Sequence, residues 1–206
     1  MTSHRSRWAR PTAVLLCVAA ALAVLAGCGQ DQRPGTFTFT SPGGQSRVFY
    51  DPPVARGLVP PIAGEDVLQP GVEISTASYR GQVVVLNIWG SWCGPCRAEA
   101  PELEAVARAT APLGVQFLGI DVRDTRDAAA DFLRDRAVSY PSIYDPPGRS
   151  LLALRGFPRN VVPSTIVLDR EGRVAAAYLT AVLAGDIEPT IRRIAAEPST
   201  RGAAGP

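Results

Sequence analysis

The 206-residue sequence contains no lysine and a single histidine, His4. Its four cysteines are Cys17, Cys28, Cys93 and Cys96. A structural zinc site built on a closely spaced cysteine pair needs two more ligands, usually Cys or His, and a Cys–His hydrolase needs a histidine base. Both chemistries are therefore excluded if His4 and the first two cysteines lie outside the folded part. The N-terminal segment indicates that they do.

A long apolar run occurs at the N-terminus. Three arginines among the first ten residues precede the apolar run 13–26, as in a secretory leader, and this run is shorter than the ~20 residues that a membrane span needs. It ends in Leu25-Ala26-Gly27-Cys28, which resembles the bacterial lipobox, whose cysteine is lipidated and becomes the first residue of the mature protein. We expect a lipoprotein signal peptide over residues 1–27 and lipidation of Cys28. The alternative is an uncleaved N-terminal anchor, and in both cases the folded part is exported and tethered to the membrane.

Cleavage of the leader would change both the thiols and the charge. Cys93 and Cys96 would remain as the only free thiols. The full chain has a net charge of +2, and loss of the three leader arginines leaves 18 basic against 19 acidic residues, or about −1. A balanced charge of this kind provides no basic field for nucleic acid. We expect no nucleic-acid partner, no metal site and no cofactor beyond a redox-active disulfide.

The motif with the clearest chemistry is Trp92-Cys93-Gly94-Pro95-Cys96. It follows the β-branched, apolar run 83–88, typical of a strand buried on both faces, and a helix is expected over 96–109. Cys93 would then lie at a helix N-terminus, where the helix dipole and free N–H groups favour the thiolate. The spacing allows Cys93 and Cys96 to form a disulfide. The pattern predicts dithiol/disulfide exchange with Cys93 as nucleophile. A purely structural disulfide is the alternative, although so short a loop would stabilise the fold little.

The region before the motif differs in composition from the rest. Residues 28–65 are rich in Gly, Pro, Ser and Thr and are expected to form a tether. Within it, the segments 36–40 and 47–50 flank Ser-Pro-Gly-Gly-Gln and predict a β-hairpin packed on the domain. The folded domain is expected over 66–197, followed by a disordered tail over 198–206.

Strands alternate with helices from about residue 71, which predicts an α/β sheet with an antiparallel pair at its end. The expected strands are 83–88, 115–121, 140–144, 165–169 and 173–180. The expected helices are 96–109, 127–137, a short one near 149–155, and 186–196.

The motif and this order of elements resemble the thioredoxin fold over roughly residues 66–197. The resemblance implies a central mixed sheet flanked by helices. The segment 87–101 resembles the exported, membrane-tethered TlpA/ResA branch, as does the additional helix-and-strand unit at 122–144. The stretches 119–124 and 140–148 also resemble the actinobacterial CcsX-type lipoproteins, which are assigned to cytochrome c maturation.

Two positions carry acid–base roles in the families that this chain resembles. Asn87 stands where cytosolic thioredoxins have a buried aspartate that helps to move protons at the second cysteine. Glu99 stands where the TlpA/ResA branch has a glutamate for that task. Glu99 follows Cys96 by three residues on the expected helix, so the two side chains share a face, and partial burial would raise the pKa of the carboxyl. The alternative is a solvated first-turn glutamate stabilised by the helix dipole.

The resemblance also implies a peptide-docking surface. In thioredoxin folds a cis proline opens the strand opposite the active site, and the backbone of the residue before it pairs with substrate. Val162-Pro163 occupies that place, and Tyr140-Pro141 is the competing candidate. Trp92 is expected to be exposed beside Cys93, and Trp89 is expected to lie in the core.

The resemblance implies reduction of the Cys-x-x-Cys disulfide of an exported apocytochrome c, or of another exported protein disulfide, before haem attachment. A CcdA-type membrane thiol transporter would supply the electrons, and Gly94-Pro95 is the thioredoxin dipeptide, which points to a reductant. The expected location is the extracytoplasmic face of the bacterial cell membrane. The alternatives are an extracytoplasmic oxidant or isomerase of the DsbA/DsbE type and a non-catalytic lipoprotein binding module.

Overall fold

The computed structural model describes residues 35–199. The predicted signal peptide, the lipidation site Cys28 and residues 200–206 of the predicted tail lie outside this range. No helix within 35–199 has the length and apolar character needed to cross a bilayer.

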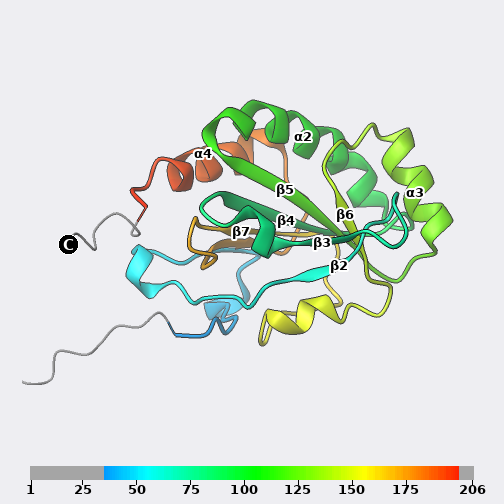
Figure 1. Ribbon diagram of the computed structural model, residues 1–206. Coiled ribbons are helices and arrows are strands. Elements are labelled where there is room, and N and C mark those ends of the chain that lie inside the picture. The colour runs from blue at the N-terminus through cyan, green and yellow to red at the C-terminus, as the bar shows by residue number, and fades with distance from the viewer. Residues whose placement is uncertain (1–34, 200–206) are drawn as a thin grey trace, which may run out of the picture. The chain divides into compact units, whose positions relative to one another are not determined.

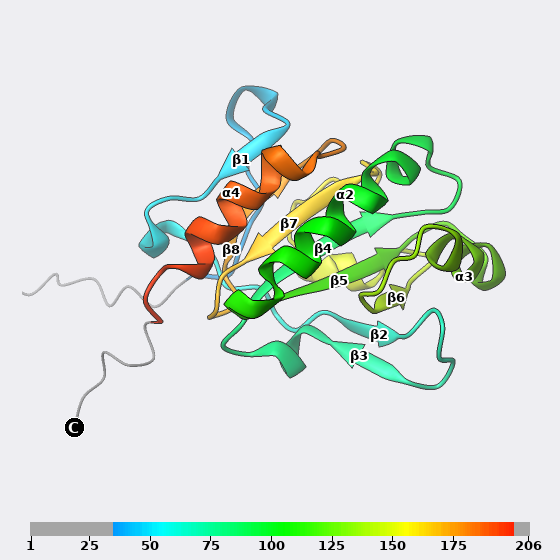
Figure 2. The same cartoon turned by 90° about the horizontal axis from the view of Figure 1, so that it is seen from above.

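A six-stranded mixed sheet forms the centre of the domain, in the order β1-β8-β7-β4-β5-β6 (Figures 1 and 2). Its strands are β1 (Arg47–Phe49), β4 (Val83–Trp89), β5 (Val115–Asp121), β6 (Ser142–Tyr144), β7 (Ser164–Leu168) and β8 (Val174–Tyr178). β4 is parallel to β5 and antiparallel to β7. β5 and β6 are parallel, and β7 and β8 form the antiparallel pair expected at the end.

Helices α2 (Gly94–Thr110) and α4 (Ala184–Ala195) lie side by side on one face of the sheet, and α3 (Arg126–Asp135) lies near the β6 edge (Figures 1 and 2). The opposite face is covered by the 3₁₀ helix η5 (Ser150–Ala153) and by the segment 37–62. The 3₁₀ helices are η1 (Pro42–Gly44), η2 (Pro53–Ala55), η3 (Thr76–Tyr79), η4 (Ala111–Leu113) and η5 (Ser150–Ala153).

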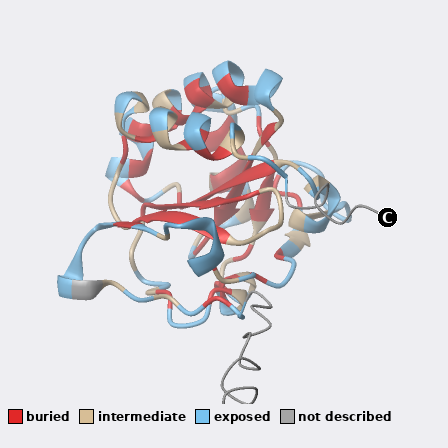
Figure 3. Ribbon diagram, turned by 90° about the vertical axis from the view of Figure 1, so that its left-hand side faces the viewer, coloured by how far each residue is buried: buried red, intermediate tan, exposed pale blue. Residues whose placement is uncertain are grey.

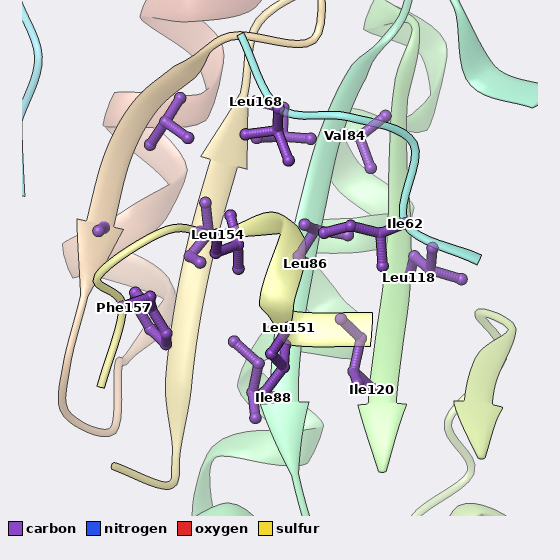
Figure 4. Packing of buried hydrophobic residues seen from close by; sticks show 14 of the residues in the cluster. Ile62, Val84, Leu86, Ile88, Leu118, Ile120, Leu151, Leu154, Phe157 and Leu168 are labelled. Atoms are coloured by element: carbon purple, nitrogen blue, oxygen red, sulfur yellow. The ribbon is translucent and has the colours of Figure 1, made fainter. Parts of the chain in front are cut away.

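Strand β4 is buried along its whole length because both of its faces are covered. Successive side chains of a strand point to opposite faces. Val83 and Val85 therefore pack with α2 and α4, while Leu86 and Ile88 pack with Leu151 of η5 on the other face (Figure 4). Burial is accordingly concentrated on the sheet and on the inward sides of the helices (Figure 3).

The predicted mixed α/β architecture is confirmed, including the helix-and-strand unit formed by α3 and β6. Strand 115–121 has the expected bounds. The strand expected over 140–144 is confined to β6, and the helix expected near 149–155 is the single turn η5.

The predicted hairpin of 36–40 with 47–50 is wrong. Thr36 and Thr38 form bridges with Leu58 and Arg155, and β1 pairs with β8 at the edge of the main sheet. The edge of β8 offers unpaired backbone groups that β1 satisfies, and Phe37 is buried in the core. The hydrogen bonds to β8 and the burial of Phe37 therefore stabilise this arrangement more than a local hairpin would.

The predicted tether over 28–65 is also corrected for its described part. Val59 is buried and its N–H donates to the Gly172 carbonyl, while the side chain of Arg56 is fully enclosed. The folded domain therefore already includes residues from Thr36 onward. A small antiparallel sheet of β2 (Ala63–Glu65) and β3 (Glu73–Ser75) was not predicted from the sequence.

Candidate active site

Cys93 and Cys96 form a disulfide at the start of α2, with their Cα atoms 5.3 Å apart. Cys93 is the N-cap residue, and its Sγ accepts a hydrogen bond from the Cys96 N–H at 3.2 Å. Gly94 and Pro95 form the exposed first turn. Cys93 is only 3% exposed and Cys96 only 1%. The expected position of Cys93 at a helix N-terminus is confirmed, so the reduced thiol would meet the positive end of the dipole.

The loop before Cys93 is held by the loop that follows β5. The N–H and Oγ of Ser91 donate to the Asp124 carboxylate at 2.5 and 2.9 Å. Nη1 of Arg97 donates to the Ser91 carbonyl at 2.6 Å. Because β4 and β5 are parallel neighbours, their carboxyl ends lie at the same edge of the sheet, which brings these two loops together.

Trp92 is 45% exposed, as expected for a docking residue. Its indole N–H donates to the Val122 carbonyl at 3.0 Å, and the Arg123 guanidinium stacks over its ring at 4.3 Å. The indole lies directly over Gly90, where an added Cβ would clash with the ring nitrogen. Trp89 is buried and stacked on Phe132, which confirms its place in the core.

Glu99 is only 2% exposed, so the alternative of a solvated first-turn glutamate is wrong. Asn87 Nδ2 donates to one carboxylate oxygen at 2.9 Å, and the Val182 N–H donates to the other at 3.1 Å. Burial raises the pKa of Glu99 to about 7, although these two hydrogen bonds oppose the shift. A carboxyl with this pKa can exchange a proton near neutral pH.

The structure places Glu99 one helical turn after Cys96, and both side chains are buried. No hydrogen bond joins the carboxylate to either cysteine within residues 35–199. Asn87 lines the small space beside Cys96 together with Tyr140, and it also holds Glu99. The amide thus binds the carboxyl and borders the same space as Cys96, and Thr165 accepts its second hydrogen bond at 3.3 Å.

The Val162–Pro163 peptide bond is cis, as expected, whereas Tyr140–Pro141 is not among the cis bonds of the described residues. Pro163 immediately precedes β7. Val162 packs against the hydrophobic cluster that contains both cysteines. The residues predicted to surround the disulfide are therefore brought together by the fold.

The sequence reading missed Asp121, at the carboxyl end of β5. It is fully buried, and neither of its carboxylate oxygens has a hydrogen-bond partner. Burial, reinforced by the neighbouring acids Asp124 and Asp145, raises the pKa of Asp121 to about 8. One sequence signal could have pointed to Asp121. It is a carboxylate at the end of β5, which is the parallel neighbour of β4, the strand that leads to the cysteine motif. Among residues 35–199 no group of three or more Cys, His, Asp or Glu side chains is arranged to hold a metal ion.

Residues 59–177 match the AhpC/TSA family. The chain belongs to this family. Among solved structures, a secreted thiol-disulfide isomerase from Corynebacterium glutamicum is 41% identical, with a TM-score of 0.76, over 79% of this chain and 99% of that one. A DsbF homologue from Corynebacterium diphtheriae is 43% identical, with a TM-score of 0.73, over 77% of this chain and 99% of that one.

Curated relatives agree with these structures. The thiol-disulfide oxidoreductase ResA of Geobacillus kaustophilus is 28% identical over 124 residues, which cover 60% of this chain and 70% of ResA. The thiol:disulfide interchange protein DsbE of Vibrio cholerae is 31% identical over 115 residues, which cover 55% of this chain and 59% of DsbE. The protein is thus a thioredoxin-fold thiol-disulfide oxidoreductase of the ResA/DsbE type, and the Cys93–Cys96 pair stands in its site.

Proposed function

We propose that this oxidoreductase reduces disulfides of exported proteins, and that its client is the Cys-x-x-Cys pair of apocytochrome c before haem attachment. The observation that carries the proposal is buried Glu99, one helical turn beyond Cys96, held by Asn87 of β4. It supplies a proton acceptor with a pKa of about 7 where the second thiol must be deprotonated. The likeness of 119–124 and 140–148 to CcsX-type lipoproteins supports the choice of client.

The reaction proceeds in two exchanges. The Cys93 thiolate attacks one sulfur of the client disulfide, forming an intermolecular disulfide and releasing one client thiolate. Cys96 then gives its proton to Glu99, and its thiolate attacks the Cys93 sulfur. The second client thiolate leaves, and the Cys93–Cys96 disulfide is formed. Two electrons pass to the client, so the oxidised form described here is the product state, and a CcdA-type membrane thiol transporter would reduce it again.

We further propose that the protein acts at the extracytoplasmic face of the cell membrane, attached through a lipid on Cys28. The arginines and apolar run of residues 1–26 support export. The similar protein from Corynebacterium glutamicum is a secreted one, which fits the same compartment.

A second candidate function is oxidation or isomerisation of disulfides, favoured by the likeness to an isomerase and to DsbE. The reduction potential of the Cys93–Cys96 pair separates the two. A value near thioredoxin's about −270 mV would support the reductant, and one near about −120 mV would support the oxidant.

The decisive experiment is deletion of the gene followed by haem staining of membrane proteins. We expect loss of c-type cytochromes, restored by the wild-type protein and not by Cys93→Ser. Normal cytochrome levels in the deletion strain would contradict the maturation role and leave the redox chemistry untouched. Full restoration by Cys93→Ser would instead favour a non-catalytic binding module.

A further inference from the structure

A groove of about 470 Å³ opens beside the active site. Three loops form its walls: residues 122–123 after β5, residues 146–148 after β6, and residues 157–160 ahead of β7. Two prolines and the ring of Phe157 give it apolar surface, and Arg123 and Arg159 give it charge.

The groove is continuous with the disulfide site through Trp92. The Val122 carbonyl at its edge accepts the indole N–H, and Arg123 stacks on the same ring. On the other side, the loop ending at Asn160 leads within three residues to the cis Pro163. A peptide held at Trp92 and Pro163 would therefore extend along this groove.

The positive charge of the groove is not neutralised by the domain itself. Arg123 and Arg159 are exposed, and neither forms an ion pair with an acid of the described part of the chain. No acidic residue lines the groove. The nearby Asp124 is engaged by Ser91, and Asp145 accepts hydrogen bonds from the N–H groups of Arg149 and Ser150.

Several other arginines of the domain are bound by its own acidic residues. Arg126 pairs with Glu65, and Arg173 pairs with Asp169. The two groove arginines form no ion pair within the described residues, and they lie beside the residues that would meet a client, with Arg123 stacked on Trp92. A guanidinium presents a planar fork of donors that fits a carboxylate with two hydrogen bonds.

We propose that Arg123 and Arg159 are specificity determinants that bind a carboxylate side chain next to the client disulfide. The groove then selects extended protein segments with Asp or Glu close to their cysteines. This inference rests on the proposed reduction of protein disulfides and names the kind of client peptide that the site prefers. Opposite charges would also speed the encounter at low ionic strength.

The test compares two disulfide peptides that are identical except that Glu and Asp beside the cysteines are replaced by Gln and Asn. The second-order rate constant for their reduction by the full-length, reduced protein is measured at low and high salt. We expect the acidic peptide to react about tenfold faster at low salt, with the preference shrinking as salt rises. The amide peptide reports the basal reaction in the same assay.

Three arginine variants locate the effect. Arg159, unlike Arg123, is not stacked on Trp92. Arg159→Ala should reduce the rate preference for the acidic peptide about threefold, and the double variant with Arg123→Ala should remove this preference. Arg80→Ala is the matched control, because this exposed arginine also lacks an ion pair among the described residues but precedes the opposite end of β4. The preference should survive in this control unchanged.

Equal rates for the two peptides with the wild-type protein would overturn this inference while leaving the proposed function standing. If neither peptide is reduced, the proposed function fails, and binding decides the inference separately. In that case the oxidised protein should still bind a Cys→Ser version of the acidic peptide more tightly than its amide counterpart. Equal binding of the two peptides would overturn the inference. Arg159-dependent binding to vesicles of anionic lipid, with no preference between the peptides, would also overturn it.

Discussion

Glu99 and Asp121 are both buried carboxyls near the disulfide, but they differ in their partners. Glu99 receives two N–H donors, whereas Asp121 receives none. The position of Glu99 could be predicted because the spacing of a helix fixes which residue follows Cys96 on the same face. Asp121 could not, since its burial depends on β6 and on loops that are distant in sequence.

Replacing Glu99 with Gln should slow the resolving step, in which Cys96 attacks the mixed disulfide, by about a hundredfold because the proton acceptor is lost. The wild-type rate of this step should rise with pH and level off near 7, and this inflection should be absent from the variant. Rapid-quench kinetics of the mixed disulfide measures both. Glu102→Gln is the control, since Glu102 lies on the same helix and accepts from the Ala184 N–H. If the inflection near pH 7 persisted in Glu99→Gln, the pH dependence of the resolving step would belong to another group.

Replacing Asp121 with Asn should flatten the dependence of stability on pH. The native state keeps a proton on Asp121 up to about pH 8, while the unfolded state releases it near 4. The free energy of unfolding should therefore fall as pH rises from about 4 to 8 and then level off. Glu99 adds a similar fall that ends near pH 7, so the interval from 7 to 8 isolates Asp121. Urea unfolding of both proteins between pH 4 and 9 measures this, and parallel curves would refute the assignment.

At the scale of elements, β4, β5 and α2 could be predicted because their patterns are local. A strand buried on both faces is recognised from its apolar run, and a helix is recognised from its capping residue and its periodicity. Both patterns lie within about fifteen residues of sequence. The pairing of β1 with β8 has no such signal, because β1 has three residues and its partner lies more than 120 positions away. The turn residues 41–45 favour a local hairpin, but β1 pairs instead with β8 at the edge of the sheet.

Gly119 in the middle of β5 shows how closely β5 packs against its neighbours β4 and β6. A Cβ at this position would clash with Ser142 Oγ and lie 2.7 Å from the indole nitrogen of Trp89. Gly119→Ala should lower the free energy of unfolding by about 1–3 kcal/mol.

Gly185→Ala is the matched control, because Gly185 lies in α4 and nothing lies within 4 Å of its Cβ position. That change should raise stability by about 0.5–1 kcal/mol through helix propensity. Thermal and urea unfolding measure both variants. A neutral Gly119→Ala would show that the β5–β6 contact is looser than described.

At the scale of the whole domain, one arginine joins the start of the described chain to its end. Arg56, 1% exposed, forms ion pairs with Asp51, Asp169 and Glu197. The composition of this region predicted a tether because Pro and Gly are common there, and no local pattern marks a residue of which two ion-pair partners lie over 100 positions away. The central strands and the position of the cysteine pair could therefore be predicted from the sequence, whereas the N-terminal boundary of the domain and the pairing of β1 could not.

Arg56→Met should lower the free energy of unfolding by about 3 kcal/mol, because it leaves buried Asp169 and its neighbours without this cation. Arg193→Met removes an exposed partner of Asp51 and Glu197 and should cost less than about 1 kcal/mol. Chemical unfolding of the two variants gives the comparison. Equal losses would mean that the burial of Arg56 adds nothing to its ion pairs.

The burial of both cysteines has a kinetic consequence for the oxidised protein. Thiol-disulfide exchange requires the attacking sulfur to reach a bridge sulfur in line, and access limits its rate. Cys93 is only 3% exposed, so few orientations of a small thiol can reach its sulfur. A protein partner that binds against Trp92 would be positioned to reach it. We therefore expect low-molecular-weight thiols to reduce this disulfide slowly, so that any protein partner able to dock there would set its redox state.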